Sequence, residues 1–159
     1  MRNRLSTEAQ KNAMKRGSAM SGFSDYESFD AIGLAALIAK REVSADEVLE
    51  AAIVRCEARN PALNAVVQEL YDHGRDMVSG ELPAGPLAGA PYLIKDLGAA
   101  IAGTPTTGGS KFMTDVVPDA DSETVIRLKQ AGMAIFGKTN PCEFGMSIPC
   151  EPQLYGPTK

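Results

Sequence analysis

Hydrophobic positions in the first half of the chain recur with the spacing of amphipathic helices. Leu34, Leu37 and Ile38 fall on one stripe, which predicts a helix over about residues 31–40. Asp30 immediately precedes this stretch, and its carboxylate is suited to cap the first turn. The chain is therefore expected to enter its folded part with a short capped helix.

A second helix is predicted to begin at "SADE", residues 44–47, because serine followed three residues later by glutamate is the signature of a capping box. The apolar positions after it have the i, i+3, i+4, i+7 spacing of one helix face: Leu49, Ala52, Ile53 and Cys56. Cys56 is therefore expected in the core rather than as a reactive thiol. The proline of "RNP", residues 59–61, is expected to end this helix.

Farther along, the pattern changes to short apolar runs bounded by glycine and proline, which are typical of strands. Residues 64–70 predict a short strand, and a polar stretch around 72–80 leads to "PAGPLAGAP", a glycine- and proline-rich connection. Residues 91–95 and 133–137 predict two buried strands, with a helix over 122–131 between them. This order predicts a right-handed βαβ unit of an α/β sheet.

One stretch matches a nucleotide-binding motif. Residues 132–139, "GMAIFGKT", satisfy the phosphate-loop pattern G-x-x-x-x-G-K-[ST]. The motif requires a strand before its first glycine and a helix after its last residue, so that backbone N–H groups converge on phosphate. Here Gly132 stands where a predicted helix stops, a strand follows, and proline comes two residues after Thr139. We therefore expect no nucleotide-binding site.

A charged pair, Lys95 and Asp96, follows the apolar part of the 91–95 strand. Ligands of α/β proteins gather at the carboxyl ends of parallel strands, so this pair is a candidate for function. From the residues alone, the alternative is a simple ion pair at a solvent edge. Ser110 lies in the loop that follows but has no histidine near it in sequence, so a turn or helix cap is the expected role.

Composition excludes several classes of protein. A chain of 159 residues with 44% hydrophobic and 23% charged residues is expected to form one soluble domain. The longest apolar run, residues 34–39, is too short to span a bilayer, and no signal peptide is evident, so the expected location is cytoplasmic. Three cysteines without C-x-x-C spacing and one histidine, His73, predict neither a disulfide framework nor a metal site.

Charge is distributed unevenly along the chain. Residues 1–16 hold five basic side chains and one acidic side chain, whereas the remainder has 11 basic and 19 acidic groups. The acidic body is expected to repel nucleic acid, and no membrane partner is expected. Residues 1–29 are interpreted as a polar, basic, solvated extension with no assigned function.

Three blocks of the sequence together resemble the amidase signature hydrolases, which cleave amide C–N bonds. These blocks are "GPLAGAPYLIKDLGAAIAGTPTTGGSKFM", "DADSETVIRLKQAGMAIFGKTNPCEFGMS" and "LYGPTK". The resemblance covers residues 30–159 and matches the amino-terminal third of such proteins. It implies an α/β fold in which the amino-terminal part of a mixed, mostly parallel sheet is covered by helices, here truncated.

The resemblance also implies site residues. The lysine of the family's "IKD" block belongs to a Ser-cisSer-Lys triad, which makes Lys95 the candidate catalytic base. In this mechanism one serine attacks the amide carbonyl, a second serine in a cis peptide relays the proton, and a neutral lysine accepts it. Gly145 and Met146 occupy positions that line the acyl pocket, although an apolar residue after a short helical turn is also typical of a core. No cofactor is expected.

The two serines of the triad belong to a glycine- and serine-rich segment beyond "YGPT", and none of Ser110, Ser122 and Ser147 matches it. The resemblance therefore implies a portion of an amide hydrolase that is inactive alone. Its substrate would be a small-molecule amide, and its expected partners are a complementing carboxyl-terminal segment or a second copy of the chain. The alternative is a non-catalytic α/β binding or complementing module. "IKDL" and "IPCEPQLYG" are more similar to stand-alone amidases acting on linear or cyclic amides than to the amidase component of glutamyl-tRNA amidotransferase.

Overall fold

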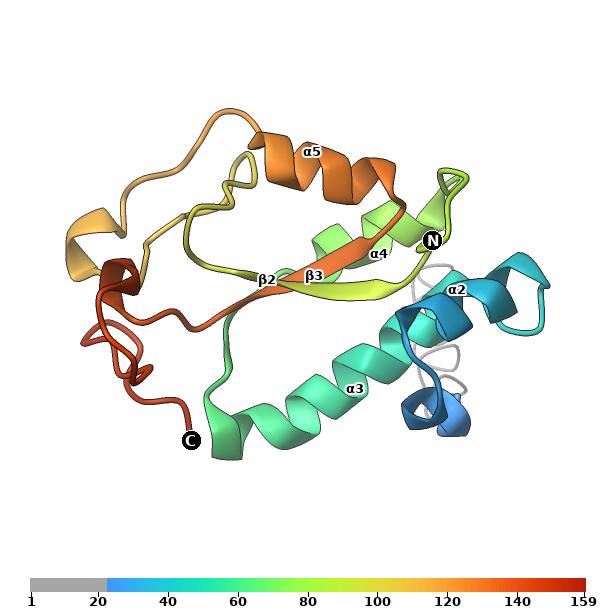
Figure 1. Cartoon of the computed structure of the whole chain (residues 1–159), viewed down its shortest axis with the longest axis horizontal. Coiled ribbons are helices and arrows are strands. Elements are labelled where there is room, and N and C mark those ends of the chain that lie inside the picture. The colour runs from blue at the N-terminus through green and yellow to red at the C-terminus, as the bar shows by residue number, and fades with distance from the viewer. Residues whose placement is uncertain (1–22) are drawn as a thin grey trace, which may run out of the picture.

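A computed structural model describes residues 23–159 of the chain (Figure 1). The α-helices and strands follow one another in the order α2 (Ala31–Ala39), α3 (Ala45–Leu63), β1 (Val66–Glu69), α4 (Tyr71–Ser79), β2 (Pro91–Lys95), α5 (Glu123–Gln130) and β3 (Ala134–Thr139). Three short 3₁₀ helices accompany them: η1 (Ser24–Ser28), η2 (Lys111–Met113) and η3 (Glu143–Gly145). The part of the predicted extension before residue 23 lies outside the described residues.

The three strands form one mixed sheet with the order β1-β3-β2. β2 and β3 run parallel, with Tyr92 opposite Ile135 and Lys95 opposite Thr139, whereas β1 is antiparallel to β3. Since α5 lies between β2 and β3 in the chain, the predicted β-α-β order and the parallel pairing of its strands are confirmed.

Successive side chains along the strands point to opposite faces of the sheet, and both faces are apolar, as expected for strands that are buried on both sides. Phe136 packs with Leu49 and Ile53 of α3, whereas its neighbour Ile135 packs with Val125 of α5. Figure 1 shows the result, with α3 and α5 on opposite sides of the strands. The sheet is therefore the middle layer between two helical layers.

The capping predictions for the first two helices are confirmed. The Asp30 carboxylate accepts a hydrogen bond from the Gly33 backbone N–H at 2.7 Å. Ser44 and Glu47 form a complete capping box: the Ser44 hydroxyl accepts from the Glu47 N–H, and the Glu47 carboxylate accepts from the Ser44 N–H. The two local sequence signals therefore set both helix starts.

The predicted end of the second helix is wrong. α3 continues through Pro61 to Leu63 and ends at Asn64, which has a left-handed conformation with φ 54°. Pro61 lies in the last turn, where a missing N–H removes only one hydrogen bond. The side-chain oxygen of Asn60 accepts from the N–H groups of Ala65 and Val66 at 2.9 and 2.8 Å and so fixes the exit from the helix.

The polar stretch around 72–80, to which the sequence assigned no helix or strand, forms the helix α4. The helix packs beside β3, and its closest approach is made by Gly74: a Cβ there would lie 2.9 Å from the Phe136 Cβ. A glycine rather than an apolar side chain marks the buried face at this point. The hydrophobic pattern therefore understates the amphipathic character of α4.

The phosphate-loop interpretation is excluded by the backbone. Gly132 follows α5 with φ 83°, a left-handed conformation that suits glycine at a helix end, and its N–H donates to the Lys129 carbonyl at 3.0 Å. Gly137, Lys138 and Thr139 then lie inside β3. The chain therefore has helix, turn and strand where the nucleotide motif needs strand, loop and helix.

η1 belongs to the predicted extension of residues 1–29 but lies against α3. The Glu27 carboxylate pairs with the guanidinium groups of Arg55 and Arg59, and the Arg55 guanidinium lies 4.9 Å from the centre of the Tyr26 ring. Among residues 23–159 no helix is both long enough and apolar enough to cross a bilayer.

Candidate active site

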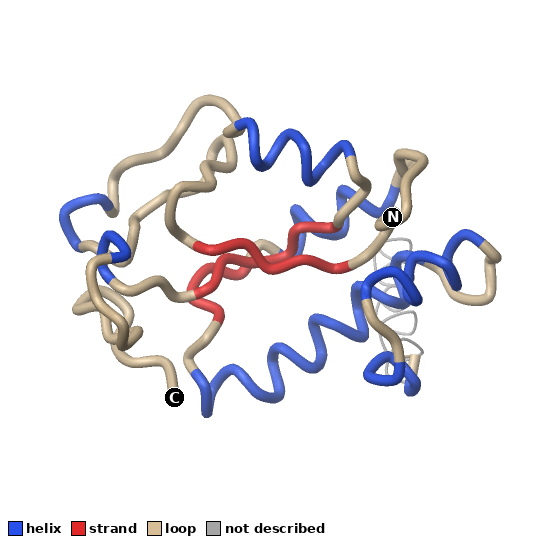
Figure 2. Tube along the Cα trace, viewed as in Figure 1, coloured by secondary structure: helices blue, strands red, loops and turns tan. Residues whose placement is uncertain are grey.

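The carboxyl ends of β2 and β3 lie at the same edge of the sheet because these strands are parallel and Lys95 is opposite Thr139. Figure 2 shows the loops that follow the two strands gathered at this end. Lys95 is the last residue of β2, and η3, with Gly145, follows β3 after a short connection. The structure therefore brings the candidate base and the candidate pocket residues to one end of the fold.

Direct contacts join the two loops. The Phe144 N–H donates to the Gly108 carbonyl at 2.8 Å. Gly145 has φ 73°, and a Cβ at this position would lie 3.2 Å from the Leu97 side chain. Since Leu97 is two residues after Lys95, the Gly145 backbone approaches the segment that carries the lysine.

Met146 is 85% exposed, so the alternative that places it in the core is wrong within this part of the chain. Phe144 and Ile148 beside it are exposed as well. Apolar side chains that are open to solvent at the end of a sheet are suited to contact a ligand or another polypeptide surface.

Asp96 turns inward although Lys95 is exposed. Its carboxylate accepts hydrogen bonds from the Thr107 N–H at 3.2 Å, the Thr107 hydroxyl at 2.5 Å and the Tyr155 hydroxyl at 3.1 Å. The backbone of Asp96 is fixed too, because its N–H donates to the Thr139 carbonyl and its carbonyl accepts from the Gly108 N–H. Asp96 therefore ties the loop after β2 to β3 and to the end of the chain.

Lys138 is the buried counter-charge of Asp96. Both side chains are fully buried, and the Lys138 Nζ lies 3.7 Å from the Asp96 Oδ1. The ammonium also donates to the Pro105 carbonyl at 2.5 Å and to the Thr106 hydroxyl at 3.2 Å, so two hydrogen bonds and one ion pair hold it inside the protein. Burial lowers the pKa of Lys138, and the Asp96 carboxylate partly offsets this effect.

Lys95 has a different environment. Its side chain is exposed, and within residues 23–159 it makes no hydrogen bond or ion pair. The simple Lys95–Asp96 ion pair considered from sequence is therefore wrong, because Asp96 pairs with Lys138 instead. Only Lys95 of these two lysines presents its amine at the edge of the sheet.

Residues 155–159 are held against the end of α3 and the segment that follows β3. The Asn64 amide donates to the carbonyls of Tyr155 and Pro157, and the Asn140 amide donates to the Gly156 carbonyl at 3.0 Å. The Thr158 hydroxyl donates to the Asn64 carbonyl at 2.8 Å. These contacts position Tyr155, whose hydroxyl reaches Asp96.

Sequence reasoning did not assign the hydrogen-bonding roles of Thr107 and Tyr155. The available signals were weak: Asp96 directly follows the candidate base, and Tyr155 belongs to the "LYGPTK" block. Nothing in the spacing indicates that a tyrosine 59 residues away bonds to that aspartate.

The serines of this part of the chain have local roles. Ser110 caps η2 and accepts from the Phe112 N–H, as expected, and the Ser147 hydroxyl donates to the Pro149 carbonyl at 3.1 Å. Ser122 precedes α5 at its cap position, but its side chain makes no cap hydrogen bond, and its buried hydroxyl has no hydrogen-bond partner within residues 23–159. Among residues 23–159 no group of histidine, cysteine and acidic side chains is arranged to hold a metal ion.

A layered α/β fold with a lysine at the carboxyl end of a parallel strand agrees with the resemblance stated from the sequence. The family model described as Amidase matches residues 47–159, and the chain belongs to this family, the amidase signature proteins. The predicted fold class is confirmed by the same comparison and by solved structures of family members.

Relatives of known function are similar over most of this chain. The 6-aminohexanoate-cyclic-dimer hydrolase of Paenarthrobacter ureafaciens is 39% identical over 132 residues, which are 82% of this chain and 26% of that protein. A glutamyl-tRNA(Gln) amidotransferase component from Salinispora tropica is 42% identical over 142 residues, or 84% of this chain and 28% of that protein. A solved 6-aminohexanoate cyclic dimer hydrolase complexed with substrate superimposes with a TM-score of 0.79 at 36% identity, covering 86% of this chain and 28% of that structure.

The chain therefore spans about a quarter of the length of the curated relatives it matches. Its identity to the 6-aminohexanoate-cyclic-dimer hydrolase is similar to its identity to the amidotransferase component. The expectation that the chain is more similar to stand-alone amidases than to the amidotransferase component, and therefore acts on the same kind of substrate as they do, thus stays a prediction.

Proposed function

We propose that this chain is the amino-terminal portion of an enzyme that hydrolyses carboxylic amide C–N bonds, with Lys95 as the proton-accepting base. The observation that carries the proposal is the contrast between two charged neighbours at the end of β2. Asp96 is buried and engaged by Thr107, Tyr155 and Lys138, whereas Lys95 is exposed at the edge where the loops meet. Family membership supports the reaction class.

In the proposed mechanism, a serine outside these residues attacks the carbonyl carbon of the amide. Its proton passes through a second serine to the amine of Lys95, and the protonated lysine returns a proton to the leaving amine as the C–N bond breaks. Water then attacks the acyl-serine, which releases the carboxylic acid and restores the serine. Lys95 accepts a proton only in its neutral form. Polypeptide that covers the exposed Lys95 in the complete enzyme would favour that form, because burial disfavours an ammonium charge.

The proposed substrate is a small linear or cyclic amide. Gly145 and Met146 are proposed to line the acyl side of its pocket, since the Gly145 backbone approaches Leu97 and the Met146 side chain is open to solvent. Relatives named as acylamidase and as cyclic-dimer hydrolase support this substrate class.

The test uses a chimera in which the portion of the Paenarthrobacter ureafaciens hydrolase that follows the matched region is joined after Lys159. Turnover of the 6-aminohexanoate cyclic dimer and of an acyl anilide is measured for the parental chimera, Lys95→Ala and Lys111→Ala. Lys111 is an exposed lysine of η2 and serves as the matched control. We expect Lys95→Ala to lower kcat by about 10²–10⁴-fold, the usual contribution of a general base, and Lys111→Ala to retain parental turnover.

Circular dichroism serves as the folding control for all three proteins. Near-parental kcat in a folded Lys95→Ala chimera contradicts the assignment of the base. A folded parental chimera without turnover of either amide contradicts the proposed reaction.

We also propose that residues 1–159 alone do not hydrolyse amides, because a base without its serine nucleophile offers no covalent route. Burst kinetics with an anilide should show no acyl-enzyme phase. Turnover by the pure chain that is blocked by a serine-directed phosphonate would mean that one of its own serines is the nucleophile.

A further inference from the structure

The end of β2 joins a side chain without contacts to a backbone that is held firmly. The Lys95 side chain is exposed and makes no hydrogen bond or ion pair within residues 23–159. The next residue, Asp96, is fully buried. Its N–H donates to the Thr139 carbonyl at 3.1 Å, and its carbonyl accepts from the Gly108 N–H at 2.9 Å. The place from which the Lys95 amine starts is therefore set through the backbone that Asp96 holds.

The carboxylate of Asp96 is the centre of a network drawn from three segments. The Thr107 hydroxyl, from the loop after β2, donates to Oδ2 at 2.5 Å, and the Thr107 N–H donates to Oδ1 at 3.2 Å. The Tyr155 hydroxyl, from the end of the chain, donates to Oδ2 at 3.1 Å. The Lys138 Nζ, from β3, lies 3.7 Å from Oδ1. A buried network with this many partners favours one arrangement of its residues.

Tyr155 connects this network to a distant part of the fold. Its hydroxyl lies 3.1 Å from the Thr107 Oγ1 and accepts from the Gln68 amide of β1 at 3.2 Å. Its backbone carbonyl accepts from the Asn64 amide at 2.8 Å. Tyr155 therefore links Asp96 to β1 and to the end of α3.

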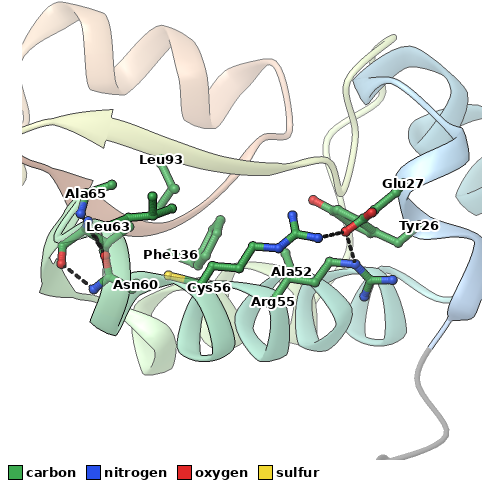
Figure 3. A pocket seen from close by; sticks show the side chains of 12 residues that line it. Tyr26, Glu27, Ala52, Arg55, Cys56, Asn60, Leu63, Ala65, Leu93 and Phe136 are labelled. Atoms are coloured by element: carbon green, nitrogen blue, oxygen red, sulfur yellow. Dashed lines mark hydrogen bonds and ion pairs between the residues drawn. The ribbon is translucent and has the colours of Figure 1, made fainter. Parts of the chain in front are cut away.

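The end of α3 is itself a fixed support. Figure 3 shows the Asn60 side chain beside Ala65, whose N–H donates to the Asn60 Oδ1 at 2.9 Å. The Asn60 amide donates to the Val66 carbonyl at 2.8 Å. Asn64, which lies within this turn, is thus held in place, and so is the Tyr155 backbone that it binds.

The network also reaches the candidate pocket. The Gly108 N–H donates to the Asp96 carbonyl, and the Gly108 carbonyl accepts from the Phe144 N–H at 2.8 Å. Phe144 precedes Gly145, so Lys95 and the proposed acyl pocket are both tied to the same aspartate. A general base must lie within hydrogen-bond reach of the proton that it takes. A displacement of about 1 Å can lower the rate by about 10²-fold.

We propose that Asp96 is the positioning residue of Lys95. Its carboxylate fixes the backbone from which the Lys95 amine reaches the serine that relays the proton, and Thr107 and Tyr155 hold the carboxylate in place. Asp96 itself touches no reacting atom. The inference rests on the proposed function, because it requires Lys95 to be the base.

The test uses the chimera described above and removes one hydroxyl from the network. Tyr155→Phe deletes a hydrogen bond to Asp96 without leaving a buried charge unpaired, and Tyr92→Phe is the matched control. The assay temperature is one at which circular dichroism shows every variant folded. We expect Tyr155→Phe to lower kcat by about 10–10²-fold and to change KM by less than about threefold. Tyr92→Phe should retain both parental values.

A double-mutant cycle separates positioning from support of the fold. A residue that acts through the base has no further effect once the base is gone. In a Lys95→Ala background, Tyr155→Phe should therefore change the remaining kcat by less than about twofold. The same fold-loss in both backgrounds would mean that Tyr155 only stabilises the protein, and the proposal would be wrong.

A second pair of variants tests the same carboxylate from the loop after β2. Thr107→Val keeps the shape of the side chain but removes the hydroxyl, whereas Thr107→Ser keeps the hydroxyl. We expect Thr107→Ser to retain kcat within about threefold and Thr107→Val to lower it by about 10–10²-fold. Equal kcat values for the two contradict the proposal.

The two proposals fail in different ways. Near-parental kcat in Lys95→Ala contradicts the assignment of the base and, with it, the positioning role. A large loss in Lys95→Ala together with parental kcat in folded Tyr155→Phe and Thr107→Val contradicts only the role of Asp96.

Discussion

Lys95 and Lys138 lie on adjacent parallel strands, one register position apart, yet their environments are opposite. Lys138 is opposite Ile94 and is fully buried with Asp96, whereas Lys95 is opposite Thr139 and is exposed. The difference arises because Lys95 is the last residue of its strand, while Lys138 lies inside β3 beneath the loop that contains Pro105 and Thr106.

The comparison teaches how to assign two lysines that both belong to recognisable motifs. The lysine of the apparent phosphate loop is a structural cation that is held inside the protein by two hydrogen bonds and an ion pair. The lysine that remains accessible is the one proposed for catalysis. A buried ion pair is costly to break because the surviving partner keeps its charge without compensation.

The largest expected effect is on stability. Lys138→Ala leaves the buried Asp96 carboxylate without its counter-charge, and we expect the free energy of unfolding to fall by about 3–5 kcal/mol. Lys95→Ala removes an exposed side chain and should change it by less than about 0.5 kcal/mol. Urea titration of both variants checks this contrast, and similar losses for the two would contradict it.

A smaller effect is expected from removing one hydroxyl next to the buried pair. Tyr155→Phe deletes the hydrogen bond to Asp96 and the acceptor of the Gln68 amide, and should cost about 1–3 kcal/mol. Tyr92→Phe is the matched control, since within residues 23–159 the Tyr92 hydroxyl makes no hydrogen bond. Chemical denaturation of both proteins measures the difference. Equal stabilities would mean that Tyr155 does not support the Asp96 network.

The pH dependence of the stability near neutrality is expected to come from His73. Burial lowers the pKa of His73, Lys129 acts in the same direction, and Asp121 and Asp76 oppose the shift. Folding thus favours the neutral imidazole, so the stability due to this form is present above about pH 6.5 and is lost as the pH falls below that value.

Thermal unfolding between about pH 5 and 7.5 provides the measurement. We expect His73→Gln to flatten the decline on the acidic side and Lys95→Ala to leave it unchanged. If His73→Gln shows the same dependence of thermal stability on pH as the parental protein, groups other than His73 cause the decline.

The last prediction is that nucleoside triphosphates do not bind. Titration with labelled ATP or GTP in the presence of magnesium should show no saturable binding, because Lys138 points into the protein from a strand. Micromolar affinity that is lost in a folded Lys138→Ala variant would return the motif to a nucleotide-binding role.

Local sequence signals predicted much of the fold correctly. The Ser44–Glu47 capping box, the cap by Asp30 and the glycine after α5 were each readable from nearby residues. The helix α4 was missed because its closest contact with Phe136 is made by a glycine, which hydrophobic periodicity does not register. Pro61 gave the wrong helix end because the side chain of Asn60 supports the turn that follows.

For the candidate site, the sequence by itself determined the order of strand, helix and strand, since periodicity and caps are local properties. It also carried the motif that singles out Lys95. Only the tertiary structure decided that Asp96 pairs with Lys138 across two strands, and that Tyr155 reaches Asp96 from the end of the chain. Such pairings depend on register and on loops that bring distant residues together, so no local pattern of residues encodes them.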